Sequence, residues 1–185
     1  MSHYIANLRD IEFCLFDLLG REKVMGIAPY GDVDRDTSVG MLEEMKRLCE
    51  NDLADSFVEG DRVGTVFNKE TGNVTLPESF KKSYKAYVDG EWWRLDAPVE
   101  LGGMKVPPSV RWAMAEMVLG SNPAIHIYAS GYAFAQVAHV LGTEKQKKIA
   151  KHMVEKHWGA TMQLTEPDAG SDVGAGRTKA VDQGD

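Results

Sequence analysis

Cysteine is scarce in this sequence of 185 residues, which contains only Cys14 and Cys49. Neither cysteine stands in a C-x-x-C pair, and the five histidines lack the H-x-x-x-H and H-E-x-x-H spacings that are typical of metal sites. We therefore expect no metal site and a reducing environment.

Long apolar runs are also absent. The sequence has no stretch of about 18 apolar residues, the length needed to cross a membrane. No positively charged segment leads into an apolar one near the N-terminus, as it would in a secretory signal. These absences predict a soluble, cytoplasmic protein without a membrane span.

Positive charge is in deficit, because 21 Lys and Arg residues stand against 28 Asp and Glu residues and give a net charge of −7. A nucleic-acid-binding surface usually shows a basic patch or stripe. The one small basic cluster consists of Lys145, Lys147, Lys148 and Lys151, and we expect no nucleic-acid partner. The hydrophobic share of 43% is ordinary for a globular protein with a real core.

Apolar residues recur at the three-and-four spacing of buried helix faces in several segments. Residues 5–19 predict an amphipathic helix that ends at Gly20, and residues 26–36 predict a loop. A long helix over 37–58 is expected next, capped by Asp36 or Thr37. A surface loop or weak ribbon over 60–75 and a helix from Pro77 through Val88 follow.

The second half begins with an ordered loop over 90–108, which is rich in Pro, Gly and Trp. Residues 110–119 and 124–141 predict apolar helices at the centre of the fold. Thr143 to Gln146 has capping-box spacing and opens a last helix, in which Ile149, Met153 and Trp158 are expected to face inward.

At Gly159 the apolar period changes from helical to twofold, which predicts a strand over 160–165 and a second short strand over 177–181. Two short strands alone are marginally stable. We therefore expect the chain to stop inside a domain, with mobile or intermolecularly paired residues at its C-terminal end.

The most informative run of residues is Met162-Gln163-Leu164-Thr165-Glu166-Pro167-Asp168-Ala169-Gly170-Ser171-Asp172-Val173. A strand that turns into a loop containing Gly and Ser can direct several N–H and hydroxyl groups at one ligand. The alternative, on composition alone, is a simple β-turn in which Ser171 and Asp172 bond to local amides.

This run resembles the T-E-P-x-A-G-S-D signature of acyl-CoA dehydrogenases. Two weaker markers of that family occur in order, the P-x-x-x-G-G loop at 98–103 and the segment Leu141-Gly142-Thr143-Glu144-Lys145-Gln146-Lys147. The resemblance covers about residues 41–181. It implies a mainly α fold, in which the N-terminal helical domain of these enzymes is followed by the first strands of their β-barrel-like middle domain.

The same resemblance implies three parts of the chain. Residues 1–36 are expected to be an N-terminal extension with an amphipathic helix, found in a longer-chain subgroup. Residues 37–158 correspond to the helical N-terminal domain, and residues 159–185 to the truncated start of the β domain.

The resemblance also implies an FAD site at Met162, Gln163, Leu164, Thr165, Gly170 and Ser171. The Leu164 amide and the Thr165 hydroxyl would bond the flavin ring, and Gly170 would allow close approach. Ser171 would contact the FAD pyrophosphate and lie beside the acyl-CoA substrate. Glu166, Pro167 and Asp172 are interpreted as shaping the turn.

The implied reaction is the α,β-dehydrogenation of an acyl-CoA to a trans-2-enoyl-CoA, as in fatty-acid β-oxidation. The family's catalytic glutamate lies beyond residue 185, so no catalytic residue is expected here and the chain alone should be inactive. Electron-transferring flavoprotein is the expected electron acceptor, and the full-length oxidoreductase should be a homo-oligomer. Residues 127–134 are the expected wall of the acyl cavity.

Two alternatives remain open at this point. The chain could be a non-catalytic helical interaction module that binds a partner helix through residues 5–19, or part of an acyl-CoA oxidase or flavin monooxygenase relative. Glu116, His126 and His139 are interpreted as ordinary core or surface residues.

Overall fold

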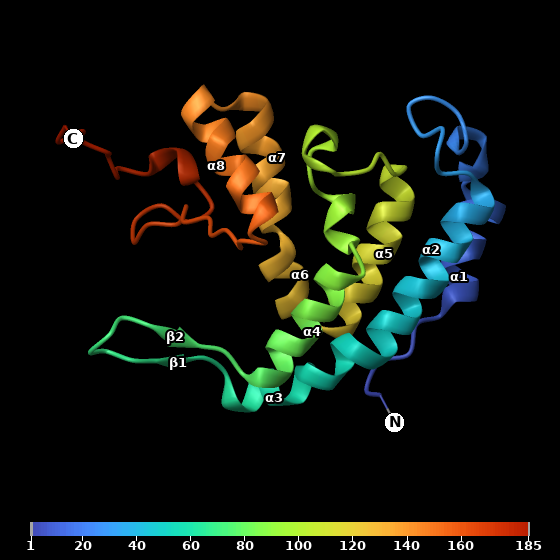
Figure 1. Cartoon of the computed structure of the whole chain (residues 1–185), viewed down its shortest axis with the longest axis horizontal. Coiled ribbons are helices and arrows are strands. Elements are labelled where there is room, and N and C mark those ends of the chain that lie inside the picture. The colour runs from blue at the N-terminus through green and yellow to red at the C-terminus, as the bar shows by residue number, and fades with distance from the viewer. Residues whose placement is uncertain (1, 185) are drawn as a thin grey trace.

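The computed structural model describes residues 2–184, which form a mainly helical molecule (Figure 1). The α-helices are α1 (Leu8–Glu12), α2 (Arg35–Leu48), α3 (Phe57–Val63), α4 (Glu78–Asp89), α5 (Pro108–Ser121), α6 (Pro123–Ala129), α7 (Gly131–Leu141) and α8 (Glu144–Glu155). β1 (Val66–Phe67) and β2 (Val74–Thr75) form an antiparallel ribbon that projects from the helices. The predicted mainly α fold class is confirmed. None of the helices described is long and apolar enough to cross a membrane.

The predicted helix over residues 5–19 is present but irregular. α1 passes directly into a π-helical turn, Phe13–Leu18, and the chain then reaches Gly20 in the left-handed region with a φ of 55°. Leu15 and Phe16 are buried, whereas Leu18 and Leu19 are exposed. A π-helix rotates less per residue than an α-helix, so the three-and-four spacing no longer keeps all these side chains on one face. The predicted helix is confirmed, but the predicted continuous apolar face is wrong.

The start of α2 differs from the prediction as well. Asp34, and not Asp36 or Thr37, is the N-cap, and its Oδ1 accepts a hydrogen bond of 2.8 Å from the Thr37 amide. This N–H group holds the pKa of the Asp34 carboxyl below its usual value. Beyond α2, a π-helical turn (Cys49–Leu53) and a 3₁₀ turn (Ala54–Ser56) complete the helical segment predicted over 37–58.

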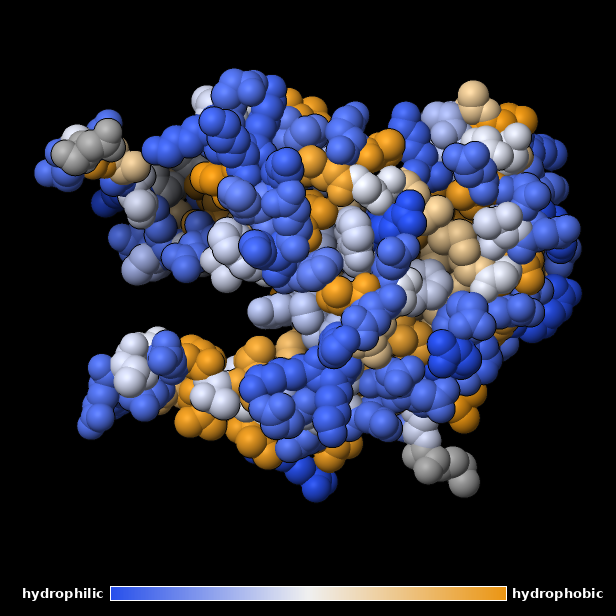
Figure 2. Space-filling view, in the orientation of Figure 1, coloured by the Kyte–Doolittle hydropathy of each residue, from blue (hydrophilic) through white to orange (hydrophobic). Residues whose placement is uncertain are grey.

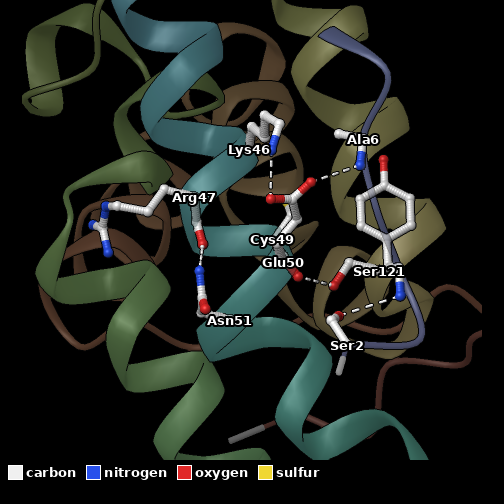
Figure 3. A network of polar contacts seen from close by, with 9 residues as sticks. Ser2, Ala6, Lys46, Arg47, Cys49, Glu50, Asn51 and Ser121 are labelled. Carbon is white, nitrogen blue, oxygen red and sulfur yellow. Dashed lines mark hydrogen bonds and ion pairs between the residues drawn. The ribbon is translucent and has the colours of Figure 1, made fainter.

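Buried polar side chains hold the π-helical turn after α2. Ser121 Oγ donates to the Cys49 carbonyl at 2.6 Å, a contact that is visible in Figure 3. Asn122 Nδ2 donates to the Leu53 carbonyl at 3.2 Å and to Ser56 Oγ at 2.9 Å. A π turn disturbs the regular ladder of backbone bonds, and these side chains supply partners to the carbonyls. Ser121 and Asn122 therefore stabilise the π-helical turn from the end of α5.

The N-terminal arm packs onto the same region. The Ala6 amide donates to Glu50 Oε1 at 2.9 Å, and the other oxygen of this carboxylate pairs with Lys46 (Figure 3). These contacts join residues that precede α1 to the end of α2.

Asn122→Ala is expected to lower the free energy of unfolding by about 2 kcal/mol, because it leaves the Leu53 carbonyl and the Ser56 hydroxyl without this buried donor. Asn51→Ala is the matched control. The Asn51 side chain is exposed and bonds only the Arg47 carbonyl, so its loss should change stability by about 0.5 kcal/mol or less. Urea denaturation of both variants measures the difference, and equal midpoints would contradict this role of Asn122.

The core is centred on α5, as predicted for residues 110–119, whereas Val137, Val140 and Leu141 of the second predicted run are exposed. Met114 and Met117 are fully buried in one cluster with Leu42 and Met45 of α2. The run 124–141, predicted as one helix, is divided at Ser130 into α6 and α7. A smaller cluster lies where α7 and α8 pack side by side, and consists of Ala97, Tyr132, Ala135, Ala150 and Val154.

The capping box that opens α8 is confirmed at Thr143 and Gln146. The inward residues of α8 are Ala150 and Val154. Ile149 and Trp158, which were predicted to face inward, are 48% and 53% exposed. The predicted helix is confirmed, and Met153 packs against the cluster between α7 and α8 as predicted, but the predictions for Ile149 and Trp158 are wrong.

The two strands predicted over 160–165 and 177–181 are wrong for the residues that the structure describes. These segments have no ladder partners, and the only β contact near them among the described residues is the isolated bridge between Glu166 and Ala169. A strand needs a neighbour to pair its backbone N–H and C=O groups. The ribbon instead forms within residues 66–75, where a surface loop or weak ribbon was expected.

Candidate functional site

Glu166 organises the turn that follows the predicted cofactor segment. Its backbone exchanges two hydrogen bonds with Ala169, at 3.0 and 3.2 Å. Its carboxylate accepts hydrogen bonds of 2.8 Å from the backbone amides of Arg177 and Thr178. These bonds lower the pKa of the Glu166 carboxyl, and the bond from the Arg177 amide contributes most. The interpretation of Glu166 as a turn-shaping residue is consistent with these bonds, which fold residues 166–178 into one loop.

The predicted cofactor residues lie on the outer surface of this loop and of the segment before it. All six are exposed, namely Met162, Gln163, Leu164, Thr165, Gly170 and Ser171. Within residues 2–184, neither the Leu164 amide nor the Thr165 hydroxyl bonds another residue. A Cβ added at Gly170 would meet no atom within 4 Å. The polar groups at these positions are therefore available to a ligand.

The segment leaves α8 through a tightly bonded turn. The His157 amide donates to the Val154 carbonyl at 3.2 Å and the Trp158 amide donates to the Met153 carbonyl at 2.9 Å. This pair of bonds is a Schellman motif, in which the residue after the helix adopts a left-handed conformation. His157 has that conformation, with a φ of 53°.

Aromatic side chains surround His157 and link it to α4 and α7. Tyr132 Oη lies 2.9 Å from His157 Nδ1, and Tyr84 Oη donates to the His157 carbonyl at 3.3 Å. The ring of Trp93 stacks on Tyr132 with 5.8 Å between centroids. Burial raises the pKa of Tyr132 far above its usual value, so the hydroxyl keeps its proton and can donate it to Nδ1.

An apolar pocket of about 550 Å³ opens beside the start of the segment. Phe57, Phe80, Ile127 and Tyr128 form apolar walls, and Ala160 and Thr161 border it on the side of the predicted cofactor residues. Figure 2 shows the molecule hollowed between the projecting ribbon and the part that carries the C-terminal segment. A concave, mainly apolar pocket of this size suits a small organic ligand.

The expected acyl-cavity wall over 127–134 is only partly at this pocket. Ile127 and Tyr128 line it, whereas Tyr132 is 1% exposed and belongs to the cluster between α7 and α8. The break at Ser130 turns the chain, so these residues do not share one helix face.

The other titratable residues that the sequence raised do not add to the site. Glu116 is exposed on α5, and His139 lies 3.8 Å from the Glu100 carboxylate. Burial is the main cause of a lowered pKa at His126. In the part of the chain that the structure describes, no three His, Cys, Asp or Glu side chains gather as a metal-ligand set.

Comparison with known proteins decides the family. The chain is 54% identical over all 185 residues to the broad-specificity linear acyl-CoA dehydrogenase FadE5 of Mycobacterium tuberculosis. It is 33% identical over 98% of its length to a 3-methylmercaptopropionyl-CoA dehydrogenase of Ruegeria pomeroyi, and 29% identical over 97% to a butyryl-CoA dehydrogenase of Syntrophomonas wolfei. The chain belongs to the acyl-CoA dehydrogenase family.

A scan of the chain against protein-family models finds no match. The chain spans only 30%, 31% and 30% of the lengths of these three acyl-CoA dehydrogenases.

Contacts link the 98–103 marker to α7, and the other two markers of the resemblance to acyl-CoA dehydrogenases flank the two ends of α8. The loop at 98–103 packs Gly102 against Trp93, where an added Cβ would lie 3.3 Å from the ring. Trp93 in turn stacks on Tyr132. The marker at 141–147 opens α8, and the same helix ends at the turn that leads into the signature. Sequence analysis included Tyr132 in the expected acyl-cavity wall over 127–134 and missed its bond to His157, because no spacing rule links positions so far apart.

Proposed function

We propose that the full-length protein is an FAD-dependent acyl-CoA dehydrogenase that converts an acyl-CoA thioester to a trans-2-enoyl-CoA. The observation that supports this most is the 54% identity with FadE5 over every residue of the chain. The signature residues and the apolar pocket beside them are the parts of this chain that would serve the reaction.

The residues present fit the edge of a flavin ring. A flavin ring needs hydrogen-bond donors along its polar edge and apolar contact on its faces. The Leu164 amide and the Thr165 hydroxyl bond no other described residue, and apolar side chains line the adjoining pocket. When bound, FAD supplies the hydride-accepting chemistry, which is a property of the cofactor itself.

This chain's own residues would bind FAD and the acyl-CoA and orient them. Donors aimed at the flavin edge stabilise the reduced, electron-rich ring. Met162 and Gln163 would run beside the ring, and Gly170 would let the backbone approach the cofactor because it has no side chain. Ser171 would contact both the pyrophosphate and the acyl-CoA.

The proposed substrate class is an acyl-CoA with an unbranched chain, because FadE5 is described as acting on linear acyl-CoA. Ile127 and Tyr128 would form part of the wall for the acyl chain. The glutamate that removes the α-proton in this family has no match in the chain, so the base would come from the remaining length. We also propose electron-transferring flavoprotein as acceptor and a homo-oligomeric assembly.

The full-length protein, purified with its cofactor, tests the proposal. Anaerobic addition of a linear acyl-CoA should bleach the visible flavin absorption and yield trans-2-enoyl-CoA. Absence of flavin, or a flavin that no acyl-CoA reduces, would contradict the proposal. Rapid oxidation of the reduced protein by O₂ would favour the oxidase alternative instead.

Thr165→Val in the full-length protein is expected to weaken FAD binding about fivefold, because one hydroxyl hydrogen bond contributes on the order of 1 kcal/mol. The visible flavin spectrum should shift while the helical content stays the same. Thr75→Val makes the same change on exposed strand β2, far from the signature in sequence, and should leave the flavin untouched. Identical spectra and affinities for both variants and the parent would remove Thr165 from the site.

A further inference from the structure

The residue that turns the chain at the end of α8 is unusual. Glycine is favoured at the left-handed position of a Schellman motif, because a Cβ there is strained by roughly 1 kcal/mol or more. Here the position is His157, with a φ of 53°. A residue with a side chain keeps this strained conformation only where its surroundings hold it, so the contacts of the His157 side chain explain its presence.

The imidazole of His157 is held on several sides. Its Nδ1 lies 2.9 Å from the hydroxyl of Tyr132, which is 1% exposed. The ring packs edge-on against Trp93 with 5.9 Å between centroids, and Tyr84 Oη bonds the His157 carbonyl at 3.3 Å. With the ring proton on Nε2, Nδ1 accepts the Tyr132 proton, so the buried hydroxyl is satisfied. A glycine at this position would form the turn but leave this bond unmade.

A second contact fixes the chain immediately after His157. A Cβ added to Gly131, in the first turn of α7, would lie 2.3 Å from the Trp158 carbonyl oxygen and 3.0 Å from the Gly159 Cα. The backbone of Trp158 and Gly159 therefore rests directly on the backbone of α7. Together with the bond from Tyr132, this contact fastens the start of the segment to α7 at two successive points.

We propose that Tyr132 and His157 are positioning residues for the cofactor, whose hydrogen bond fixes the direction in which residues 160–165 leave α8. This inference rests on the proposed function. Thr165 follows His157 by only eight positions, and a small rotation at the turn moves the Leu164 amide and the Thr165 hydroxyl away from a common target. Neither Tyr132 nor His157 touches the cofactor in this assignment.

The physical reason is preorganisation. Binding is weakened when a ligand must order the groups that contact it, since the loss of backbone freedom then opposes binding. A turn that is already fastened to α7 has lost that freedom during folding. Loosening it should therefore weaken FAD binding without removing a single contact to FAD.

Tyr132→Phe in the full-length protein tests this role. Removal of the hydroxyl ends its contacts with His157 Nδ1 at 2.9 Å and with Tyr84 Oη at 3.3 Å. It should weaken FAD binding by about five- to tenfold and shift the visible flavin band. Tyr87→Phe is the matched control, because Tyr87 is equally buried and its hydroxyl bonds the Trp92 carbonyl at 3.3 Å. Tyr87→Phe should lower the melting temperature by a similar amount and leave FAD affinity and spectrum unchanged.

Two substitutions of His157 separate positioning from general stability. His157→Asn keeps an acceptor near Nδ1 and tolerates the left-handed conformation, so it should retain FAD affinity within about twofold. His157→Ala removes the acceptor and should match Tyr132→Phe.

The inference is overturned if Tyr132→Phe and Tyr87→Phe alter FAD affinity equally, or if His157→Asn is as impaired as His157→Ala. Failure of the proposed function is a separate outcome, since it would be seen in the parent protein as an absence of bound flavin or of reduction by acyl-CoA.

Discussion

Gly103→Ala is expected to lower the free energy of unfolding by about 3 kcal/mol, at the upper end of the usual cost of overpacking. An added Cβ would lie 1.9 Å from the Ala97 carbonyl oxygen, 2.6 Å from the Ala97 carbonyl carbon and 2.9 Å from the Pro98 carbonyl carbon. All three atoms belong to the backbone, so no side chain can rotate away. The Gly103 amide also donates to the Pro98 carbonyl at 2.8 Å, and a shift of the loop would stretch this bond.

The displacement should spread beyond the loop. Trp93 lies against Gly102 and stacks on Tyr132, and Met104 donates to the Arg94 carbonyl at 2.8 Å on the other side of the glycine pair. Moving the loop therefore disturbs the cluster between α7 and α8. Thermal or urea denaturation, followed by far-ultraviolet circular dichroism, measures the loss.

Gly170→Ala is the informative counterpart, because the same chemical change meets open space at that position. Its effect on stability should stay within about 0.5 kcal/mol. If the proposed FAD site is right, Gly170→Ala nevertheless weakens FAD binding in the full-length protein, since the new methyl group faces the cofactor. The same substitution is thus expected to lower stability at Gly103 and to weaken FAD binding at Gly170. Equal stabilities for the two variants would show that the 98–103 loop is not tightly packed.

The helices were predictable from sequence because each carries its own apolar period. α2, α5 and α8 appear in segments where apolar residues recur at helical spacing or gather in apolar runs, and the Thr143 capping box marked its helix start correctly. These signals are local, so they require no knowledge of what packs on the helix.

The errors arise from backbone conformations and contacts that the apolar period does not encode. Which side chains of residues 5–19 are buried depends on a π-helical turn, and the N-cap of α2 depends on the loop conformation at Asp34. Strands at 160–165 and 177–181 require neighbours that local alternation does not supply. The hydrogen bond between Tyr132 and His157 joins positions 25 residues apart in the sequence, and no local sequence pattern predicts it.

The signature residues illustrate a different limit. Their chemical types and order were enough to indicate a family, and the identities with known acyl-CoA dehydrogenases bear that out. Their roles toward FAD stay predictions, because the exposure of Leu164 and Thr165 shows availability and not occupancy. Variants at these positions, and not further inspection of the sequence, distinguish a ligand edge from a simple turn.

The 185-residue chain expressed alone is expected to fold but to bind FAD weakly or not at all, and to form no enoyl-CoA from acyl-CoA. The chain spans 30% of the length of FadE5, and no acid in it matches the family's catalytic glutamate. The loss of turnover should therefore be complete, which makes it the largest effect predicted for activity.

Weak cofactor binding follows from the state of the C-terminal segment. Residues 160–165 pair with no strand in the described part of the chain, and Met162, Leu164 and Val181 are 70%, 53% and 73% exposed. The hydrogen bond between Tyr132 and His157 fixes only the start of the segment. Ordering the remainder during binding costs roughly 1 to 2 kcal/mol per backbone residue, which offsets the few bonds that Leu164, Thr165 and Ser171 can offer.

Calorimetric titration of the purified chain with FAD, beside the full-length protein as control, measures the difference. The full-length protein should bind one FAD per subunit tightly, and the chain alone should give little heat at the same concentrations. Its unpaired backbone and exposed apolar side chains should also promote pairing between copies, so sedimentation is measured in parallel. A tight one-to-one complex with the chain alone, or enoyl-CoA formation with an artificial electron acceptor, would show that these residues already hold a complete site.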